Sequence, residues 1–142
     1  MKKVDSFSRC LDVLRGADFE MANEDEIYRT GIIGQFNLTF ELAWKALQAV
    51  LRIHGADSQT GSPREILQMG YKAGFVDDSA AWLAMLKERD SSVNIYDEDR
   101  INELILLIRD TFILAFTILE KTLEKKMEEA GSEEDMAFVK NT

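Results

Sequence analysis

The sequence predicts an all-α fold of four or five helices joined by short links. No stretch alternates apolar and polar residues with the period of two that marks a half-buried strand. Apolar residues instead recur every three or four positions over long stretches. One proline and eight glycines in 142 residues leave few points at which a helix must stop. We therefore expect neighbouring helices to pack antiparallel in a small bundle.

Two amphipathic helices are predicted in the N-terminal part of the chain. The first runs from about Lys3 to Met21, on an apolar stripe of Phe7, Cys10, Leu11 and Leu14. The second runs from about Glu24 to His54, begins at an Asn23 cap, and carries a longer aromatic stripe of Ile33, Phe36, Phe40, Trp44, Leu47 and Leu51. The single histidine, His54, lies in the last turn, where an imidazole complements the helix dipole, and Gly55 supplies the left-handed cap.

The middle of the chain predicts two shorter helices. In Ser62-Pro63-Arg64-Glu65 the serine caps, the proline takes the first helical position, and the glutamate reaches back. That helix ends near Ala73. A second helix begins at Asp77 or Asp78 and ends at Arg89, with an inward face of Trp82, Met85 and Leu86.

The last helix is predicted from an Asp97 cap to about Met127. It is apolar on more than one face, which is typical of a helix that is central in its own bundle or shared with a second chain. Because a bundle this small has few central positions, we expect a homodimer that uses this helix. The residues that follow are rich in acidic side chains. We expect a helical domain over residues 1–127 and a loosely ordered acidic tail over residues 128–142.

Composition and charge narrow the class of function. A net charge of −9 argues against general nucleic-acid binding, because neutralising phosphates requires a basic surface. The N-terminus shows no signal peptide, and the most apolar segment, 104–119, is interrupted by Arg109 and Asp110. The single Cys10 suits a reducing compartment. We expect a cytoplasmic protein that does not bind membranes.

Few residues carry recognisable chemistry. The sequence contains no Cys/His zinc cluster, no glycine-rich phosphate loop and no H-E-x-x-H pair, so we expect neither metal nor cofactor. Glu41 and Lys45 are four residues apart, a spacing that favours an ion pair on the surface or along a groove beside the aromatic stripe. Trp44 and Trp82 have the helical spacing of core residues, although either ring could stack on a base.

The richest polar stretch is Arg89-Asp90-Ser91-Ser92-Val93-Asn94-Ile95-Tyr96, between two predicted helices. Arginine at a helix end can make a two-pronged contact with phosphate, and tyrosine adds a stacking face and a hydroxyl. The binding candidates in this stretch are Arg89, Asp90, Asn94 and Tyr96. The alternative is a loop that holds itself in place by internal hydrogen bonds.

Several motifs resemble one known family. The run Phe36-Asn37-Leu38-Thr39-Phe40-Glu41-Leu42-Ala43-Trp44-Lys45 is similar to the signature of the nucleotidyltransferase substrate-binding proteins, part of the broader HEPN group of helical domains. The segments 62–65, 82–86 and 89–98 resemble the same family in the same order, so the resemblance covers roughly residues 4 to 125.

The resemblance implies a fold and a partner. The fold is a four-helix up-and-down bundle with an additional short helix, usually a homodimer. The partner is a minimal nucleotidyltransferase encoded by a neighbouring gene, which would share a nucleotide or small-molecule substrate with this chain. Together, two such chains resemble an antibiotic-modifying nucleotidyltransferase split in two.

Many relatives are interpreted as toxin–antitoxin pairs, and this chain matches their pattern only in part. In those pairs the helical protein is a ribonuclease with an arginine, four to six residues, and a histidine; adenylylation of a tyrosine two residues further on silences it. Arg89 matches the arginine and Tyr96 the adenylylated tyrosine, but Asn94 replaces the histidine. An amide cannot exchange a proton near neutral pH. A second departure is Asn37, where the family usually has glutamate.

Three functions therefore remain open. The first is a non-catalytic binding subunit that helps shape the substrate site of its nucleotidyltransferase, with no catalytic residue of its own. The second is a ribonuclease toxin, weakened by Asn94, and only this alternative implies RNA as a ligand. The third is an adaptor dimer without a small-molecule site.

Overall fold

The computed structural model describes residues 1–57, 60–91 and 97–140, and the side chains of residue 91 and residues 132–140 are not described. The described residues form helices joined by turns and short links, without a strand, which confirms the all-α prediction. The elements are α1 (Lys2–Arg15), α2 (Met21–Glu24), α3 (Glu26–Ile53), α4 (Pro63–Lys72), α5 (Ser79–Ser91), α6 (Glu98–Leu107), the π-helical turn η1 (Ile108–Phe112) and α7 (Ile113–Lys140).

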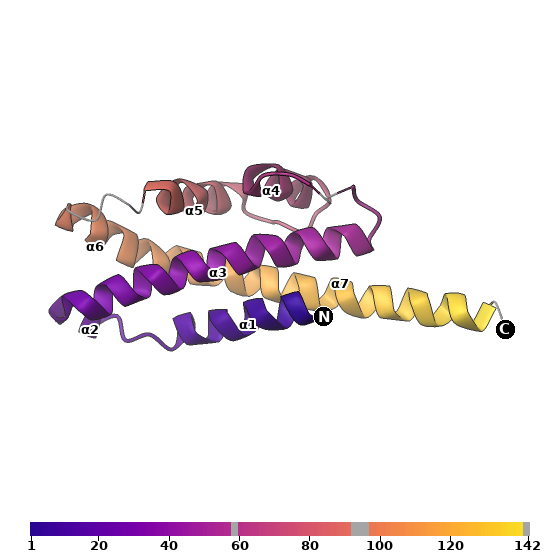
Figure 1. Cartoon of the computed structure of the whole chain (residues 1–142), viewed down its shortest axis with the longest axis horizontal. Helices are drawn as coiled ribbons and strands as arrows, with labels where there is room; N and C mark the ends of the chain where they lie inside the picture. Colours follow the sequence, from indigo (N-terminus) through magenta and orange to yellow (C-terminus); the bar gives the residue numbers. More distant parts are fainter. Residues whose placement is uncertain (58–59, 92–96, 141–142) are drawn as a thin grey trace.

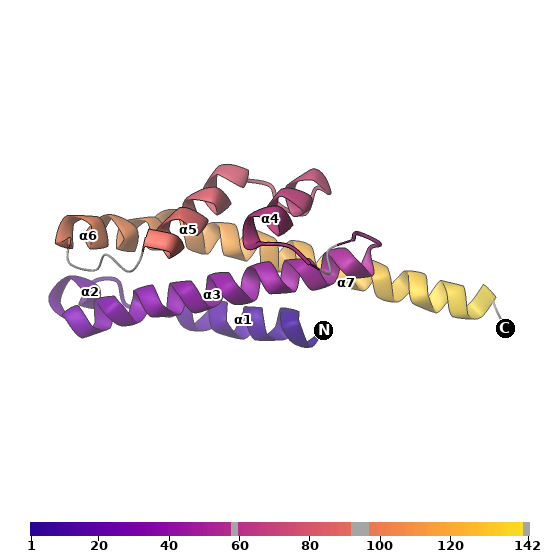
Figure 2. The ribbon, with the colours of Figure 1, turned by 45° about the horizontal axis from the view of Figure 1, so that its top comes forward.

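The long elements alternate in direction along one axis (Figures 1 and 2). In Figure 1, α3 runs through the middle of the molecule, with α1 on one side of it and the α4–α5 arm on the other. The chain then returns through α6 and η1 into α7, whose C-terminal part projects beyond the other helices (Figures 1 and 2). Where a four-helix bundle has its third long helix, this chain has two short helices, α4 and α5.

The N-terminal helices begin and end differently from the prediction. The predicted first helix to Met21 is wrong, because α1 ends at Arg15 and the Asp18 carboxylate accepts hydrogen bonds from the backbone of Glu20 and Met21. Side-chain hydrogen bonds of this kind compete with a continuing helix and start a new one, α2. The cap of α3 is Asp25, which accepts from the Tyr28 amide, and not Asn23.

The predicted caps in the middle of the chain are confirmed. Ser62 accepts a hydrogen bond from the Glu65 amide at 3.2 Å, with Pro63 at the start of α4. Asp78 accepts from the Ala81 amide at 3.1 Å and so begins α5. Asp97 accepts from the Asp99 and Arg100 amides at the start of α6. Each cap satisfies amides that the helix itself leaves unpaired.

The predicted last helix consists of three consecutive elements, α6, η1 and α7. The π-helical turn η1 adds a residue to the repeat, so Ile108 and Phe112 both point into the core. On the outer side of η1, Arg109 and Asp110 are exposed and paired. Helix α7 continues to Lys140, past the end predicted near Met127. Within the described parts of the chain, no helix has both the length and the apolar character needed to cross a membrane.

Within the core, aromatic rings from α1, α3, α5, η1 and α7 pack together, with Phe7 of α1 against Phe116 at 6.1 Å. Phe36 of α3 stacks on Phe112 of η1, with ring centroids 5.3 Å apart. Trp82 of α5 meets Phe116 of α7 edge-on at 5.5 Å and lies 6.2 Å from Phe40 of α3. Edge-to-face and offset contacts of this kind add to the free energy gained by burying the rings.

An ion pair at Arg15 links α1 to α7. Arg15, at the end of α1, forms an ion pair with the nearly buried Glu120 of α7 at 3.2 Å and a second with Asp12. The hydrogen bond to Asp12 is the main cause that raises the pKa of Arg15. Two elements distant in sequence are therefore held together at this end by a charged pair as well as by rings.

Candidate functional site

The candidate site lies where the end of α5 meets the middle of α3. Trp82, Met85 and Leu86 of α5 are buried against the core, and Arg89 follows Trp82 by two turns on the same face. Helical periodicity therefore turns the arginine toward α3 rather than toward water. The packing of α5 on α3 therefore places this cation on the bundle.

Arg89 contacts two side chains of α3. Its Nη2 forms an ion pair with the Oε1 atom of Glu41, and its guanidinium lies 5.9 Å from the centroid of the Phe40 ring. The neighbouring Asp90 carboxylate is 3.7 Å from Nη1, at the outer side of the same group. Both members of the Glu41–Arg89 pair keep about a third of their side chains exposed, 29% and 33%.

Glu41 is itself held in position. The Nε1 atom of Trp44 donates a hydrogen bond of 3.0 Å to Glu41 Oε2, so each carboxylate oxygen has a contact. The spacing predicted Lys45 as the ionic partner of Glu41, but among the described residues Glu41 pairs with Arg89. The Lys45 ammonium instead lies 5.8 Å from the Trp44 ring centroid.

Glu41 therefore fixes the orientation of the Arg89 guanidinium. A guanidinium carries five N–H donors, and a carboxylate engages at most two of them, so one carboxylate can orient an arginine that also binds an anion. Partial burial strengthens such a pair relative to one in bulk water. The described part of the site can therefore bind a phosphate or carboxylate group, or a flat ring stacked on the guanidinium.

Two predicted site residues cannot be placed. Asn94 and Tyr96 lie outside the described residues, so their positions relative to Arg89 stay a prediction. Asp90 is exposed beside Arg89. Of the six candidates, the structure thus brings Glu41, Arg89 and Asp90 together, with Lys45 one turn further along α3.

His54 lies at the end of α3, as the sequence predicts. It is the C-cap of α3, its Nε2 atom is 2.8 Å from the carbonyl oxygen of Lys126, and its ring meets Phe75 edge-on at 5.6 Å. Gly55 follows at φ +88°, the left-handed conformation expected of the cap. Among the described residues, no three His, Cys, Asp or Glu side chains are grouped as metal ligands would be.

The sequence matches the family described as nucleotidyltransferase substrate binding protein like, over residues 2–125. The chain belongs to this family. The match includes Glu41 and Arg89 and extends to the first half of α7. The resemblance inferred from the motifs in α3, α4, α5 and the stretch after it is therefore confirmed.

A comparison with solved structures agrees on the fold. A solved structure from Haemophilus influenzae, described as revealing the fold of a substrate binding domain of a nucleotidyltransferase, is similar to this chain with a TM-score of 0.73. The alignment covers 85% of this chain and 98% of that one, at 18% sequence identity. At this identity the likeness shows a shared helical fold. A search of curated proteins found no match.

Membership of the family does not by itself locate a ligand on this chain. A cleft between α4 and α5 was missed by the sequence interpretation. Two of its residues, Tyr71 and Leu83, are apolar side chains that stay exposed. Their exposure is decided by how the two short helices diverge, and no spacing in the sequence signals it.

Proposed function

We propose that this member of the substrate-binding family is a non-catalytic subunit that partners a separate minimal nucleotidyltransferase and helps to form its substrate site. The observation that carries the proposal is Arg89, held on α3 by Glu41 and Phe40. A guanidinium oriented in advance loses little conformational freedom when it binds an anionic group. Family membership supports the same assignment.

The absence of the motif histidine favours binding over RNA cleavage. Asn94 stands where ribonuclease relatives carry histidine, and an amide cannot transfer a proton near neutral pH. Loss of general acid–base help removes about 10²–10⁴-fold in rate. Under this proposal Arg89 and Tyr96 contribute to binding, and Tyr96 is a candidate site of adenylylation by the partner.

The outer face of the last helical path supports a homodimer. Leu106 of α6, together with Leu114 and Ile118 of α7, is exposed on that path, Leu114 by 61%. Apolar side chains at helical spacing on an otherwise packed helix are typical of a surface that a second copy covers. We propose that two chains associate there and that each carries one Glu41–Arg89 site.

The test is to measure binding of a fluorescent nucleoside triphosphate to the partner alone and to the reconstituted pair. Under this proposal, the partner is a minimal nucleotidyltransferase that a neighbouring gene encodes. We expect the pair to bind more tightly, and Arg89→Ala to weaken binding by about tenfold, close to 1.4 kcal/mol. Glu41→Gln should give a smaller loss, because it frees the guanidinium without removing it.

Arg9→Ala is the matched control, since it removes the same charge from an exposed position on α1, on the far side of α3 from α5. It should leave nucleotide binding unchanged. Equal binding by the pair and by the partner alone would contradict the proposal. RNA cleavage by the isolated chain that Arg89→Ala abolishes would establish the ribonuclease alternative instead, and cleavage that appears only in Asn94→His would identify the missing proton-transfer group.

A further inference from the structure

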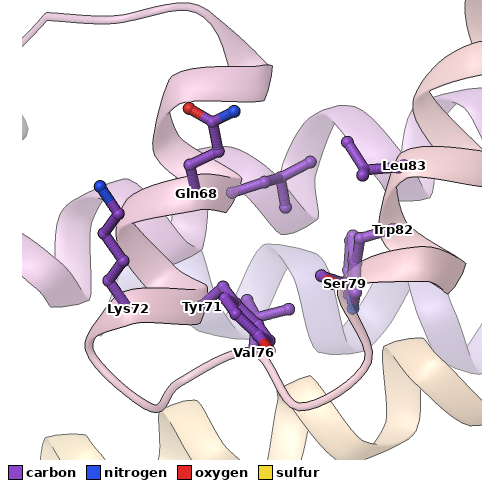
Figure 3. Close-up of a pocket in the computed structure, with 8 residues that line it drawn as sticks. Gln68, Tyr71, Lys72, Val76, Ser79, Trp82 and Leu83 are labelled. Carbon is purple, nitrogen blue, oxygen red and sulfur yellow. The ribbon is translucent and has the colours of Figure 1, made fainter.

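A cleft of about 350 Å³ lies between α4 and α5, away from the Glu41–Arg89 pair. In Figure 3, Tyr71 from α4 and Trp82 from α5 lie on opposite sides of it, with Val76 of the connecting link between them. Leu83 stands at the α5 edge. The volume falls in the range of about 300–1,000 Å³ that is typical of small-molecule sites.

The base of the cleft is held by the backbone. The amides of Phe75 and Val76 both donate to the carbonyl oxygen of Gly70, at 2.8 and 3.1 Å, and Gly74 takes a left-handed φ of +80°. Gly70 also lets α4 approach α3 closely, because a methyl group there would lie 2.9 Å from Leu47 Cδ2. The link between the two helices is therefore fixed, and the cleft exists before any ligand arrives.

The lining favours an aromatic ligand. Val76 and Trp82 are buried and form an apolar floor, while Tyr71 keeps 53% of its surface exposed at the wall. Flat rings gain both burial and offset or edge contacts against such side chains. The amide of Gln68 and the hydroxyl of Ser79, at the margin, are suited to a hydrogen-bonding edge of that ring.

The charges around the cleft disfavour an anion. Asp78 caps α5 next to Ser79, and Asp77 beside it is exposed, so two carboxylates lie at that end. Lys72 extends along α4 away from Trp82 in Figure 3. A negative group placed near Ser79 would meet like charge, because the lining cation, Lys72, lies at the α4 margin of the cleft.

We propose that the cleft between α4 and α5 binds an uncharged, flat heteroaromatic molecule against Tyr71 and Leu83, over the largely buried Val76 and Trp82. This site is separate from the guanidinium site and does not depend on a nucleotidyltransferase partner. Trp82 also lies 6.2 Å from Phe40, the ring over which Arg89 sits, so a ligand against Trp82 borders the support of the first site.

The experiment uses three probes on the purified full-length chain: quinoline, quinoline-4-carboxylate and cyclohexanol. Isothermal titration should show saturable binding of quinoline with a Kd on the order of 1 mM, ordinary for a ligand of this size. The carboxylate and the aliphatic alcohol should bind at least about fivefold more weakly, because they add charge or lose the ring. In Trp44→Phe, where Trp82 is the remaining tryptophan, quinoline should also change the fluorescence.

Variants at exposed positions keep the fold while altering the cleft. Tyr71→Ala should weaken quinoline binding by about tenfold, and Leu83→Ala by less. Leu38→Ala, at an exposed leucine on α3 outside the cleft, should leave the Kd unchanged. Asp78→Asn keeps a capping residue but removes the charge, so binding of the carboxylate should improve.

Three results would overturn the assignment: no saturable binding of quinoline, an unchanged Kd in both Tyr71→Ala and Leu83→Ala, or cyclohexanol that binds as tightly as quinoline. Tighter binding of the carboxylate than of quinoline would overturn the uncharged class. Circular dichroism of each variant shows whether the fold is intact before its Kd is compared.

Discussion

The two sides of α3 are built differently. Toward α1, η1 and α7, the rings of Phe36, Phe112 and Phe116 interlock and are fully buried, and Arg15 braces the end. Toward α4 and α5, the covering helices are short, 10 and 13 residues, and they leave a cleft between them. Long helices bury a continuous stripe, whereas short ones that diverge leave side chains half covered.

The difference separates stability from binding. Close packing of the rings on the α1–α7 side makes each of them costly to remove. The α4–α5 arm carries both candidate sites: Arg89 at the end of α5, and the cleft at its start. Both candidate sites thus lie on the short helices α4 and α5, which pack against the long helix α3.

The largest expected effect is on the packed side. Phe36→Ala should lower the free energy of unfolding by about 3–5 kcal/mol, because it removes a fully buried ring, whereas Leu83→Ala in the arm should cost about 0.5 kcal/mol. Urea denaturation followed by circular dichroism measures both. If Phe36→Ala does not fold, Phe36→Leu should still cost about 1–2 kcal/mol. Equal losses for the two sites would show that the arm is packed as tightly as the core.

An intermediate effect is expected where the arm meets α3. A methyl group at Gly70 would lie 2.9 Å from Leu47 Cδ2 and Val76 Cγ2, so Gly70→Ala should cost about 1–2 kcal/mol after its gain in helix propensity. Gly34→Ala is the matched control, since nothing lies within 4 Å of its added methyl. That variant should gain about 0.5–1 kcal/mol. A stabilised Gly70→Ala would mean that α4 is free to shift on α3.

The smallest effect is expected on the outer side of η1. The hydrogen bond from Arg109 lowers the pKa of Asp110, so the pair stabilises the fold above the ordinary pKa of aspartate, and its contribution is lost as the pH falls through the lowered value. Both side chains are exposed, and Asp110→Asn should barely change the unfolding midpoint at pH 7. An NMR titration should show the pKa of Asp110 rising toward its ordinary value in Arg109→Ala. An unchanged titration would show that the ion pair does not persist in solution.

Sequence reasoning succeeded where the cause is local. The caps at Ser62, Asp78 and Asp97 follow from side chains that reach amides two or three residues away, and the structure confirms each of them. It failed over residues 16–25. There the Asp18 carboxylate accepts hydrogen bonds from nearby backbone amides, which ends the first helix early, and Asp25 rather than Asn23 caps α3. Local signals identify the start of a helix only when a single nearby residue can act as its N-cap.

The candidate site was foreseen in part. Arg89 and Glu41 were each singled out, but their pairing joins positions 48 residues apart and depends on the register of α5 against α3. Spacing alone favoured Lys45, four residues away, as the partner of Glu41. Asn94 and Tyr96 lie outside the described residues, and their roles stay predictions.

The amino-acid sequence by itself determined the helical class, the inward stripes and the family, because periodicity, capping and signature motifs are written along the chain. Only the tertiary structure decided which charges meet, where η1 shifts the helical phase, and where a cleft remains. Those features depend on how helices distant in sequence approach one another. The distance between two helices is set by the side chains between them, and at Gly70 the absence of a side chain lets α4 lie close to α3.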